Sequence, residues 1–192
     1  MRLKREFFLK SPEIVARNLL GKSLFFRGKR VIIVEVESYG ANDPACHAFR
    51  GKTPRNEPMF KEGGRSYVYF IYGMHNCFNV VTGKEDVPSA VLIRGGFPIA
   101  GLKEIKKLRG KSEPEKRILI GPGNFCKGLG IGREENDLDL CDSTDFYFYE
   151  GDTEAAGLTV GISPRIGISQ GKDKLWRFFL KDFSIQQIKI AR

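Results

Sequence analysis

The segment from Val31 to Tyr39 constrains the fold of this chain more than any other part of the sequence. β-Branched residues dominate it and a glycine stands near each end, which predicts a β-strand. Successive side chains of a strand point to opposite faces, and residues two apart lie about 7 Å from each other. One face would be wholly apolar, with Ile32, Val34 and Val36. The other face would change from apolar to acidic along its length, with Val31, Ile33, Glu35, Glu37 and Tyr39.

Two carboxylates on one face of an otherwise apolar strand allow two interpretations. The strand could lie at the edge of a sheet, with Glu35 and Glu37 in solvent. Alternatively, the face could form the floor of a cleft, where one acid acts as a general base and a cation balances its charge. This segment alone does not decide between the two interpretations.

A second segment, Tyr67–Tyr72, has the sequence Tyr-Val-Tyr-Phe-Ile-Tyr and is followed by Gly73. We predict strands at Arg65–Ile71 and Cys77–Thr82, joined as a hairpin by a glycine-containing turn. Tyrosines in strands commonly form cross-strand aromatic contacts, but their faces also stack on nucleic-acid bases. The last tyrosine differs, because at the tip of a hairpin it has little core to enter, so we expect it to be exposed as a wedge.

Other segments complete the expected secondary structure. A helix should begin at a Ser11 hydroxyl cap and end at Gly21, and a second should run from Leu102 to Leu108 and end at Gly110. Further strands are predicted at Ala90–Arg94, Phe146–Tyr149 and Trp176–Leu180. Because strands and helices do not alternate regularly and no linker divides residues 1–192, we expect a single α+β domain around an antiparallel sheet.

Composition narrows the classes of protein that fit. Lys and Arg number 32 against 23 Asp and Glu, a formal net charge of +9, so a polyanion is the first partner to consider. No apolar run approaches the roughly 18 residues that cross a membrane, and no signal peptide is evident. The four cysteines, Cys46, Cys77, Cys126 and Cys141, form no Cys-x-x-Cys pair, so we expect reduced thiols and a cytoplasmic protein.

Motifs for metals and cofactors do not fit the chain. Each histidine lies near a cysteine, as Cys46-His47 and His75-Asn76-Cys77, but neither pair has the spacing of zinc ligands. The zinc deaminase signature and the glycine patterns of phosphate-binding and dinucleotide-binding loops are also absent. We therefore expect neither a metal nor a cofactor.

Several of these segments together resemble the alkyladenine (3-methyladenine) DNA glycosylase family. The resemblance is strong over residues 31–98 and weaker over residues 120–131 and 163–180. The matching motifs are Val34-Glu-Val-Glu-Ser-Tyr39, Ala45-Cys-His47, Thr53-Pro-Arg-Asn56, Met59-Phe60, Tyr67-Val-Tyr-Phe-Ile-Tyr-Gly-Met74, Asn79 and Val91-Leu-Ile-Arg94.

The resemblance implies a fold and a reaction. The fold would be a curved antiparallel sheet with a protruding β-hairpin, surrounded by helices. A monomer would bind double-stranded DNA, turn a damaged purine out of the helix and hydrolyse its N-glycosidic bond with water, using no metal or cofactor. By motif position Glu37 would activate the water, Glu35 would support it, and Tyr72 would fill the gap left by the flipped nucleotide.

The resemblance also implies the base pocket. The base would lie between Tyr69 on one side and Tyr39 with His47 on the other, and electron-rich rings favour a cationic alkylated purine. Asn79 would discriminate among purines, and we expect its NH₂ group to face the base. Arg94 would position Glu37 and contact a phosphate. Residues 40–46 and His75 depart from the family pattern, which bears on the range of substrates.

Two other interpretations remain open from the sequence. A non-catalytic nucleic-acid-binding module would also have a basic surface and stacking tyrosines, but it would have no use for Glu37. A glycosylase of the helix-hairpin-helix class would explain Leu129-Gly-Ile-Gly132, but that class is helical and this chain is rich in predicted strands.

Overall fold

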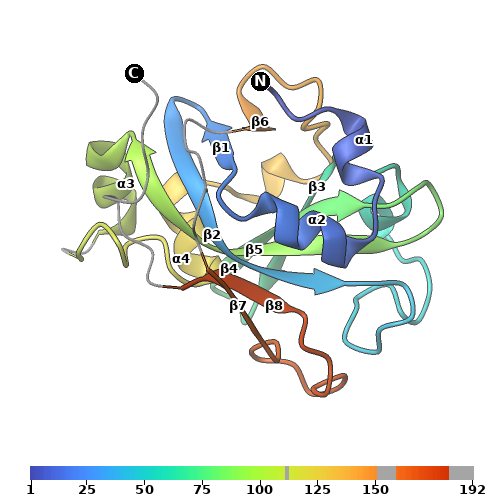
Figure 1. Cartoon of the computed structure of the whole chain (residues 1–192). Coiled ribbons are helices and arrows are strands. Elements are labelled where there is room, and N and C mark those ends of the chain that lie inside the picture. The colour runs from blue at the N-terminus through green and yellow to red at the C-terminus, as the bar shows by residue number, and fades with distance from the viewer. Residues whose placement is uncertain (111–112, 151–158, 182–192) are drawn as a thin grey trace.

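The structure, a computed structural model, describes residues 1–110, 113–150 and 159–181. Within these ranges every pair of strands is antiparallel and the strands form one curved sheet (Figure 1). The strands are β1 (Ser23–Phe26), β2 (Lys29–Tyr39), β3 (Ser66–Ile71), β4 (His75–Thr82), β5 (Ser89–Ala100), β6 (Phe146–Tyr149), β7 (Val160–Ser163) and β8 (Arg177–Leu180). Their order is β3-β4-β5-β2-β1-β6, and β8 pairs with both β2 and β7. The predicted α+β fold with an antiparallel sheet is confirmed.

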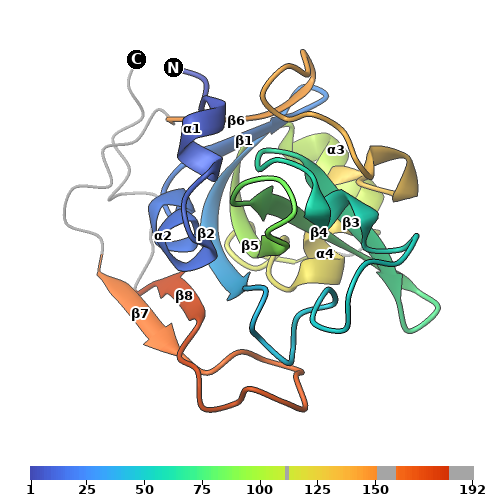
Figure 2. The ribbon, with the colours of Figure 1, turned by 90° about the vertical axis from the view of Figure 1, so that its right-hand side faces the viewer.

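Helices cover both faces of this sheet (Figures 1 and 2). The helical elements are α1 (Arg5–Phe8), α2 (Pro12–Leu19), α3 (Leu102–Arg109), α4 (Pro122–Leu129) and the short 3₁₀ helices Glu57–Phe60 and Arg133–Glu135. Helix α2 packs on β2 and β5, whereas α4 packs on β4 and β5 and supports α3. Each helix buries one apolar stripe, such as Val15, Ala16 and Leu19 of α2. No helix within the described ranges is long and apolar enough to span a membrane.

Strand β2 is hydrogen-bonded along both of its edges. One edge pairs with β5, and the other pairs first with β1 and then with β8. Glu37, for example, lies between Leu92 of β5 and Arg177 of β8. The interpretation of β2 as an edge strand with solvated acids is therefore wrong, since Glu35 is 8% exposed and Glu37 is 0% exposed.

Strand β5 is longer than predicted, because it continues from Arg94 through two glycines to Ala100. Glycine weakens an isolated strand, which is why the prediction stopped at Arg94. Here the glycines permit close packing: a Cβ atom on Gly96 would lie 2.2 Å from Cγ1 of Val31. The same region contains irregularities in the β2–β5 register around Glu35, so the glycines adapt β5 to a bulged neighbour.

The ends of α2 agree only partly with the sequence. The helix ends before Gly21, which has a φ of +80°, as predicted. Ser11 occupies the N-cap position, but its hydroxyl makes no capping hydrogen bond, so the expected cap is wrong. The α-helices α1 and α4, the strands β1 and β7 and both 3₁₀ helices were not predicted at all. The helix α4 also ends at Gly130, and its place in a strand-rich fold excludes the helix-hairpin-helix interpretation.

The predicted hairpin is confirmed as β3 and β4, and its turn projects beyond the rest of the fold (Figure 2). Tyr72 and Gly73 both have positive φ, +54° and +66°, and Met74 N–H donates to Ile71 O at 3.2 Å. Positive φ at both central residues matches the twist of the flanking strands. It is costly for a residue as large as tyrosine, and such strain concentrates at functional sites. Tyr72 is 77% exposed, as the sequence predicted.

Candidate active site

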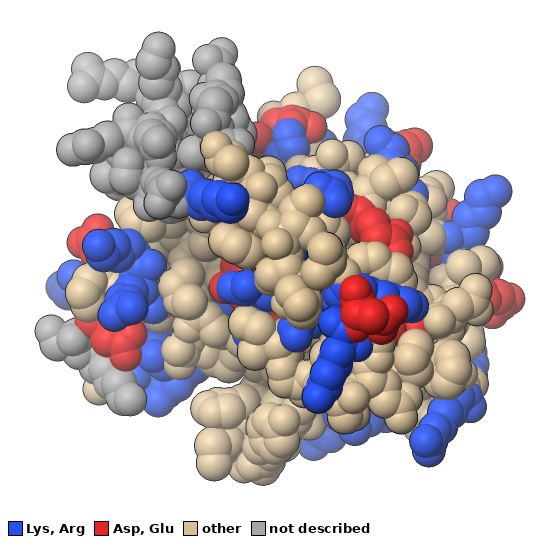
Figure 3. Space-filling view, turned by 60° about the horizontal axis from the view of Figure 1, so that its bottom comes forward, with Lys and Arg blue, Asp and Glu red and all other residues tan. Residues whose placement is uncertain are grey.

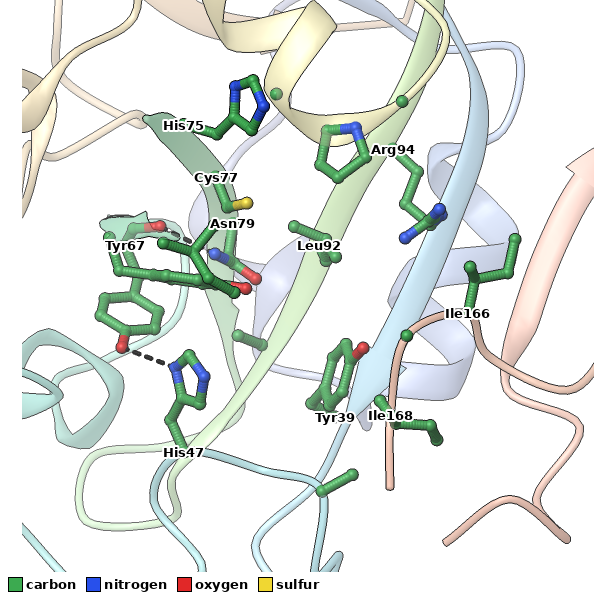
Figure 4. A pocket seen from close by; sticks show the side chains of 18 of the residues that line it. Tyr39, His47, Tyr67, His75, Cys77, Asn79, Leu92, Arg94, Ile166 and Ile168 are labelled. Atoms are coloured by element: carbon green, nitrogen blue, oxygen red, sulfur yellow. Dashed lines mark hydrogen bonds between the residues drawn. The ribbon is translucent and has the colours of Figure 1, made fainter. Parts of the chain in front are cut away.

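Four neighbouring strands direct their side chains into one pocket. In the register of the sheet, Tyr67 of β3 lies opposite Asn79 of β4, Asn79 opposite Leu92 of β5, and Leu92 opposite Glu37 of β2. Directly opposed residues of antiparallel strands project from the same face. Residues two positions away along the same strands extend this row, namely Tyr69, Cys77, Ala90, Arg94 and Tyr39. The period of two therefore brings side chains of β2, β3, β4 and β5, from Tyr39 to Arg94, to the floor of a cavity of about 540 Å³ (Figure 4).

Loops complete the walls of this pocket. One loop, residues 40–47, follows β2 and contributes Pro44, Ala45 and His47. A second loop joins β7 to β8 and contributes residues 166–169. The hairpin and the start of α4 close the remaining side with Tyr72, His75 and residues 121–124. All predicted site residues except Glu35 and Glu37 thus line the same cavity.

Glu37 lies behind the pocket wall, and each of its oxygens accepts a hydrogen bond. The Tyr39 hydroxyl donates to Oε2 at 2.8 Å, and the backbone N–H of Ile166 donates to Oε1 at 2.8 Å. The Nε of Arg94 lies 3.4 Å from Oε1. The side chain has no exposed surface. The strand, the face and the neighbouring tyrosine of Glu37 were predicted from the sequence. The complete burial of its carboxylate was not predicted.

Arg94 is shared between the two acids of β2. Its Nε donates to Glu35 Oε1 at 2.9 Å, a shorter contact than the one to Glu37. Glu35 Oε1 also accepts a hydrogen bond from Arg177 Nε at 2.7 Å. Burial alone would lower the pKa of Arg94, but Glu37 and Glu35 outweigh burial and raise this pKa. Arg94 is therefore a permanent cation at the edge of the pocket, held in place mainly by Glu35.

The aromatic walls differ in one respect from the predicted arrangement. Tyr39 lies across the pocket from Tyr67, with His47 near the Tyr67 side (Figure 4). The ring of His47 contacts Tyr69 edge-on at 4.5 Å between centroids, and its Nδ1 lies 2.9 Å from the Tyr67 hydroxyl. A base between two rings needs about 3.5 Å on each side, so no base fits between His47 and Tyr69 unless they separate. The open gap faces Tyr39.

Burial favours the uncharged forms of Tyr39, Tyr67, Tyr69 and His47. Burial and the neighbouring Glu37 raise the pKa of Tyr39, and burial together with Cys77 raises the pKa of Tyr69. Burial raises the pKa of Tyr67 to about 12. Desolvation by the surrounding side chains, with Arg55 nearby, lowers the pKa of His47. Neutral, electron-rich rings attract a cationic purine, whereas a charged imidazole would repel it.

Asn79 lies on the pocket floor, but its orientation is opposite to the prediction. Its Nδ2 donates to the carbonyl oxygen of Tyr67 at 3.0 Å, which fixes the amide because a carbonyl needs a donor. The amide oxygen of Asn79 consequently faces the pocket (Figure 4). The expectation that the NH₂ group faces the base is therefore wrong. The side chain is 4% exposed and has little freedom to move aside.

Sequence reasoning missed the contribution of the β7–β8 loop. Ile166 supplies a backbone N–H to Glu37, and Ile166 and Ile168 project into the pocket region (Figure 4). A backbone donor leaves no trace in the residue type, and the run Pro-Arg-Ile-Gly-Ile-Ser over 164–169 has no regular period. The weaker resemblance over residues 163–180 was the available signal.

Metal-ligating side chains do not gather in the described part of the chain. No group of three or more His, Cys, Asp and Glu that could hold a metal ion occurs there. All four cysteines are free thiols. Burial raises the pKa of Cys77, the one cysteine that lines the pocket, which keeps it protonated and unreactive.

Comparisons with known proteins show to which family the chain is similar. A family model described as methylpurine-DNA glycosylase matches residues 6–184. A Wolbachia protein (sp. subsp. Brugia malayi, strain TRS) is 50% identical over 177 residues, 92% of this chain and 95% of the relative. A Carboxydothermus hydrogenoformans protein is 46% identical over 186 residues, 95% and 96% of the two chains. A Rickettsia rickettsii (strain Sheila Smith) protein is 45% identical over 183 residues, which are 95% of this chain and 91% of the relative. Each bears the name "Putative 3-methyladenine DNA glycosylase".

Proposed function

Because the chain belongs to the methylpurine-DNA glycosylase family, we propose that its pocket receives an alkylated or deaminated purine turned out of duplex DNA. As a DNA-repair glycosylase, the protein hydrolyses N-glycosyl bonds. In our proposal the bond broken joins that purine to its deoxyribose, water is the nucleophile, and the product is an abasic site in the DNA.

The observation that carries this proposal is the enclosed carboxylate of Glu37 beside an aromatic pocket. The carboxylate accepts hydrogen bonds from Tyr39 and Ile166 and lies near a permanent cation, Arg94. Such groups orient a carboxylate and leave lone pairs free to accept a proton. Because Glu37 has no exposed surface, water must reach it between Tyr39, Arg94 and Ile166, the groups that touch it.

These positions support the following reaction. Glu37 accepts a proton from water while the water oxygen bonds to the anomeric carbon of the sugar. The electrons of the glycosidic bond leave with the purine, which is a good leaving group when it is alkylated and cationic. The sugar develops positive charge in the transition state, and the carboxylate stabilises it as in O-glycoside hydrolysis. Tyr39 and Tyr69 stack on the base and offset the cost of removing it from the helix.

DNA is the partner, and the positive net charge of the chain favours binding to it. Figure 3 shows Lys and Arg side chains in several separate groups with Asp and Glu beside them. The net charge of +9 supplies an overall attraction to phosphates, and Tyr72 extends from the hairpin as the wedge. We propose that Arg94 contacts a phosphate near the flipped nucleotide, and that the protein acts as a monomer in the cytoplasm without a metal or cofactor.

A non-catalytic binding module is not favoured, since a binder of phosphates gains nothing from the buried acid Glu37. The test is base release from duplexes carrying 3-methyladenine, 7-methylguanine, hypoxanthine or ethenoadenine, with EDTA present. The proposal expects release of at least one of these bases and an abasic site in the same strand. Binding without release of any base would contradict it.

A further inference from the structure

Two loops that line the pocket are joined behind it by a buried ion pair. Asp43 lies in the loop after β2, and Arg165 lies in the loop between β7 and β8. Arg165 Nη2 donates to Asp43 Oδ1 at 2.9 Å, and Nη1 donates to Oδ2. Both side chains are completely shielded from solvent. The two residues are 122 positions apart, so this pair connects distant parts of the chain.

The same guanidinium contacts the backbone and the rings beside the pocket. Its central carbon lies 4.6 Å from the centre of the Tyr39 ring and 5.2 Å from that of Trp176. Its Nη1 also donates to the carbonyl of Ser38 at 3.0 Å, and its Nη2 donates to the carbonyl of Gly171 at 3.3 Å. Arg165 therefore packs behind Tyr39, which leaves the pocket side of that ring for the base.

The residue that follows Arg165 contacts the carboxylate of Glu37. The N–H of Ile166 donates to Glu37 Oε1 at 2.8 Å, and the side chain of Ile166 lies near Tyr39 and Arg94 (Figure 4). Since Arg165 is fixed by Asp43, by the Ser38 carbonyl and by an aromatic ring, the next N–H along the backbone is held in place as well. Both donors to Glu37, the Tyr39 hydroxyl and this N–H, thus depend on Arg165.

We propose that Arg165, held by Asp43, is a positioning residue for hydrolysis: it orients Tyr39 and the Ile166 N–H against Glu37. It contacts neither base nor water, and this inference rests on the proposed function. The residue must be arginine, because the planar fork of a guanidinium bonds two carboxylate oxygens and stacks on a ring at the same time. A lysine at this position keeps the charge but provides neither the fork nor the planar face.

The test is Arg165→Lys, assayed for single-turnover release of a base that the wild-type protein excises, with enzyme in excess. Affinity is measured for a duplex with a tetrahydrofuran abasic analogue, which engages the hairpin and the phosphate contacts but offers no base. We expect the release rate to fall about tenfold or more while this affinity changes less than about twofold, since small misplacements cost rate more than binding. Trp176 is the only tryptophan of the chain, and its emission should shift when the stacked guanidinium is lost.

Arg109→Lys is the matched control. Arg109 is also buried, at 4% exposed, and its Nε donates to Ile118 O at 2.9 Å, but it does not line the pocket. This variant should lower thermal stability without changing the release rate. If Arg165→Lys does not fold, the paired variant Asp43→Asn with Arg165→Gln replaces it, because removing both charges leaves no unpaired ion in the interior.

Three results would overturn the inference. A folded Arg165 variant that releases base at the wild-type rate shows that the contact is not needed. Equal losses of rate and affinity show that Arg165 supports the DNA-binding surface as a whole. No release by the wild-type protein would overturn the proposed function itself, and this inference with it.

Discussion

Glu37 and Asn79 show how single residues are fixed before substrate arrives. Glu37 accepts the N–H of Ile166 and the hydroxyl of Tyr39, one on each oxygen. Asn79 donates to the carbonyl of Tyr67 and presents its oxygen to the pocket. In the proposed reaction neither side chain needs to reorganise, and such preorganised polar groups are usually the largest source of electrostatic stabilisation.

His47 should make release of cationic bases depend on pH. Its pKa lies below the ordinary value, so the ring is neutral at pH 7 and gains a proton only as pH falls well below 6.5. A protonated ring repels a cationic purine, so release of 7-methylguanine relative to hypoxanthine should stay constant from about pH 7.5 to pH 6.5 and fall as the pH is lowered further. His47→Gln should weaken this change in the ratio.

His75→Gln is the comparison, because His75 is the other histidine of the chain and lines the pocket on the side opposite His47, at the exposed hairpin (Figure 4). This variant should retain the wild-type dependence of the release ratio on pH. The comparison between variants at each pH cancels the titration of every other group. If His47→Gln and the wild-type protein show the same ratio throughout, the charge of His47 has no part in base binding.

Asn79→Ser should broaden the range of purines. The amide is held against Tyr67 O with little freedom to move, and we expect it to crowd the exocyclic amine of a guanine-type base. The shorter serine opens that space, so excision of guanine-type bases relative to adenine-type bases should rise about tenfold. Asn79→Gln, which keeps the amide but lengthens it, should lower the same ratio. An unchanged ratio in both variants, measured on matched duplexes, would place selection elsewhere.

Among the secondary-structure elements, the β3–β4 hairpin carries Tyr72, the proposed wedge. Tyr72→Ala should weaken binding to a lesion-containing duplex about tenfold, because stacking of one aromatic ring on a base contributes roughly 1–3 kcal/mol. The slope of log affinity against log salt should stay the same, since no charge is lost. Met74→Ala is the control, because Met74 is 68% exposed at the same turn. Equal effects of the two substitutions would contradict a specific wedge.

The elements that sequence could predict are those with a strong local pattern. The alternation in Lys29–Tyr39 and the aromatic run of Ser66–Ile71 identified two strands that supply the pocket. Helix α4 was missed because Pro-Gly-Asn-Phe-Cys-Lys-Gly-Leu contains two glycines, and it is stabilised by packing on β4 and β5. The extension of β5 was missed for a similar reason, since the close packing of Gly96 against Val31 and Phe125 is a tertiary contact.

The residue pattern could predict the candidate site only on regular strands and at the hairpin tip, and the family resemblance added His47 from a loop. Period two placed Glu35, Glu37 and Tyr39 on one face. It could not show that Arg165 and Asp43 meet, because loops have no period and this contact spans 122 residues. It also could not show that the Ile166 N–H meets Glu37, because every residue except proline carries that donor.

For the whole molecule, the positive charge should dominate binding to undamaged DNA. The formal net charge is +9. Each phosphate contact adds about −0.9 to the slope of log affinity against log salt concentration, so the slope should be clearly negative. The measurement is a salt titration of affinity for an undamaged duplex and for a lesion-containing duplex. A flat plot for both would contradict binding through phosphates.

The most direct test of the account is single-turnover base release by Glu37→Gln with the enzyme in excess over lesion DNA. The glutamine can accept the Ile166 N–H and donate to the Tyr39 oxygen, so the variant should fold and bind the duplex as the wild-type protein does. Release should fall at least about a hundredfold, because charge and proton acceptor are both lost. Glu135→Gln, at another fully buried acid, is the control and should release base normally. Release by Glu37→Gln near the wild-type rate would remove Glu37 from the mechanism and contradict the account.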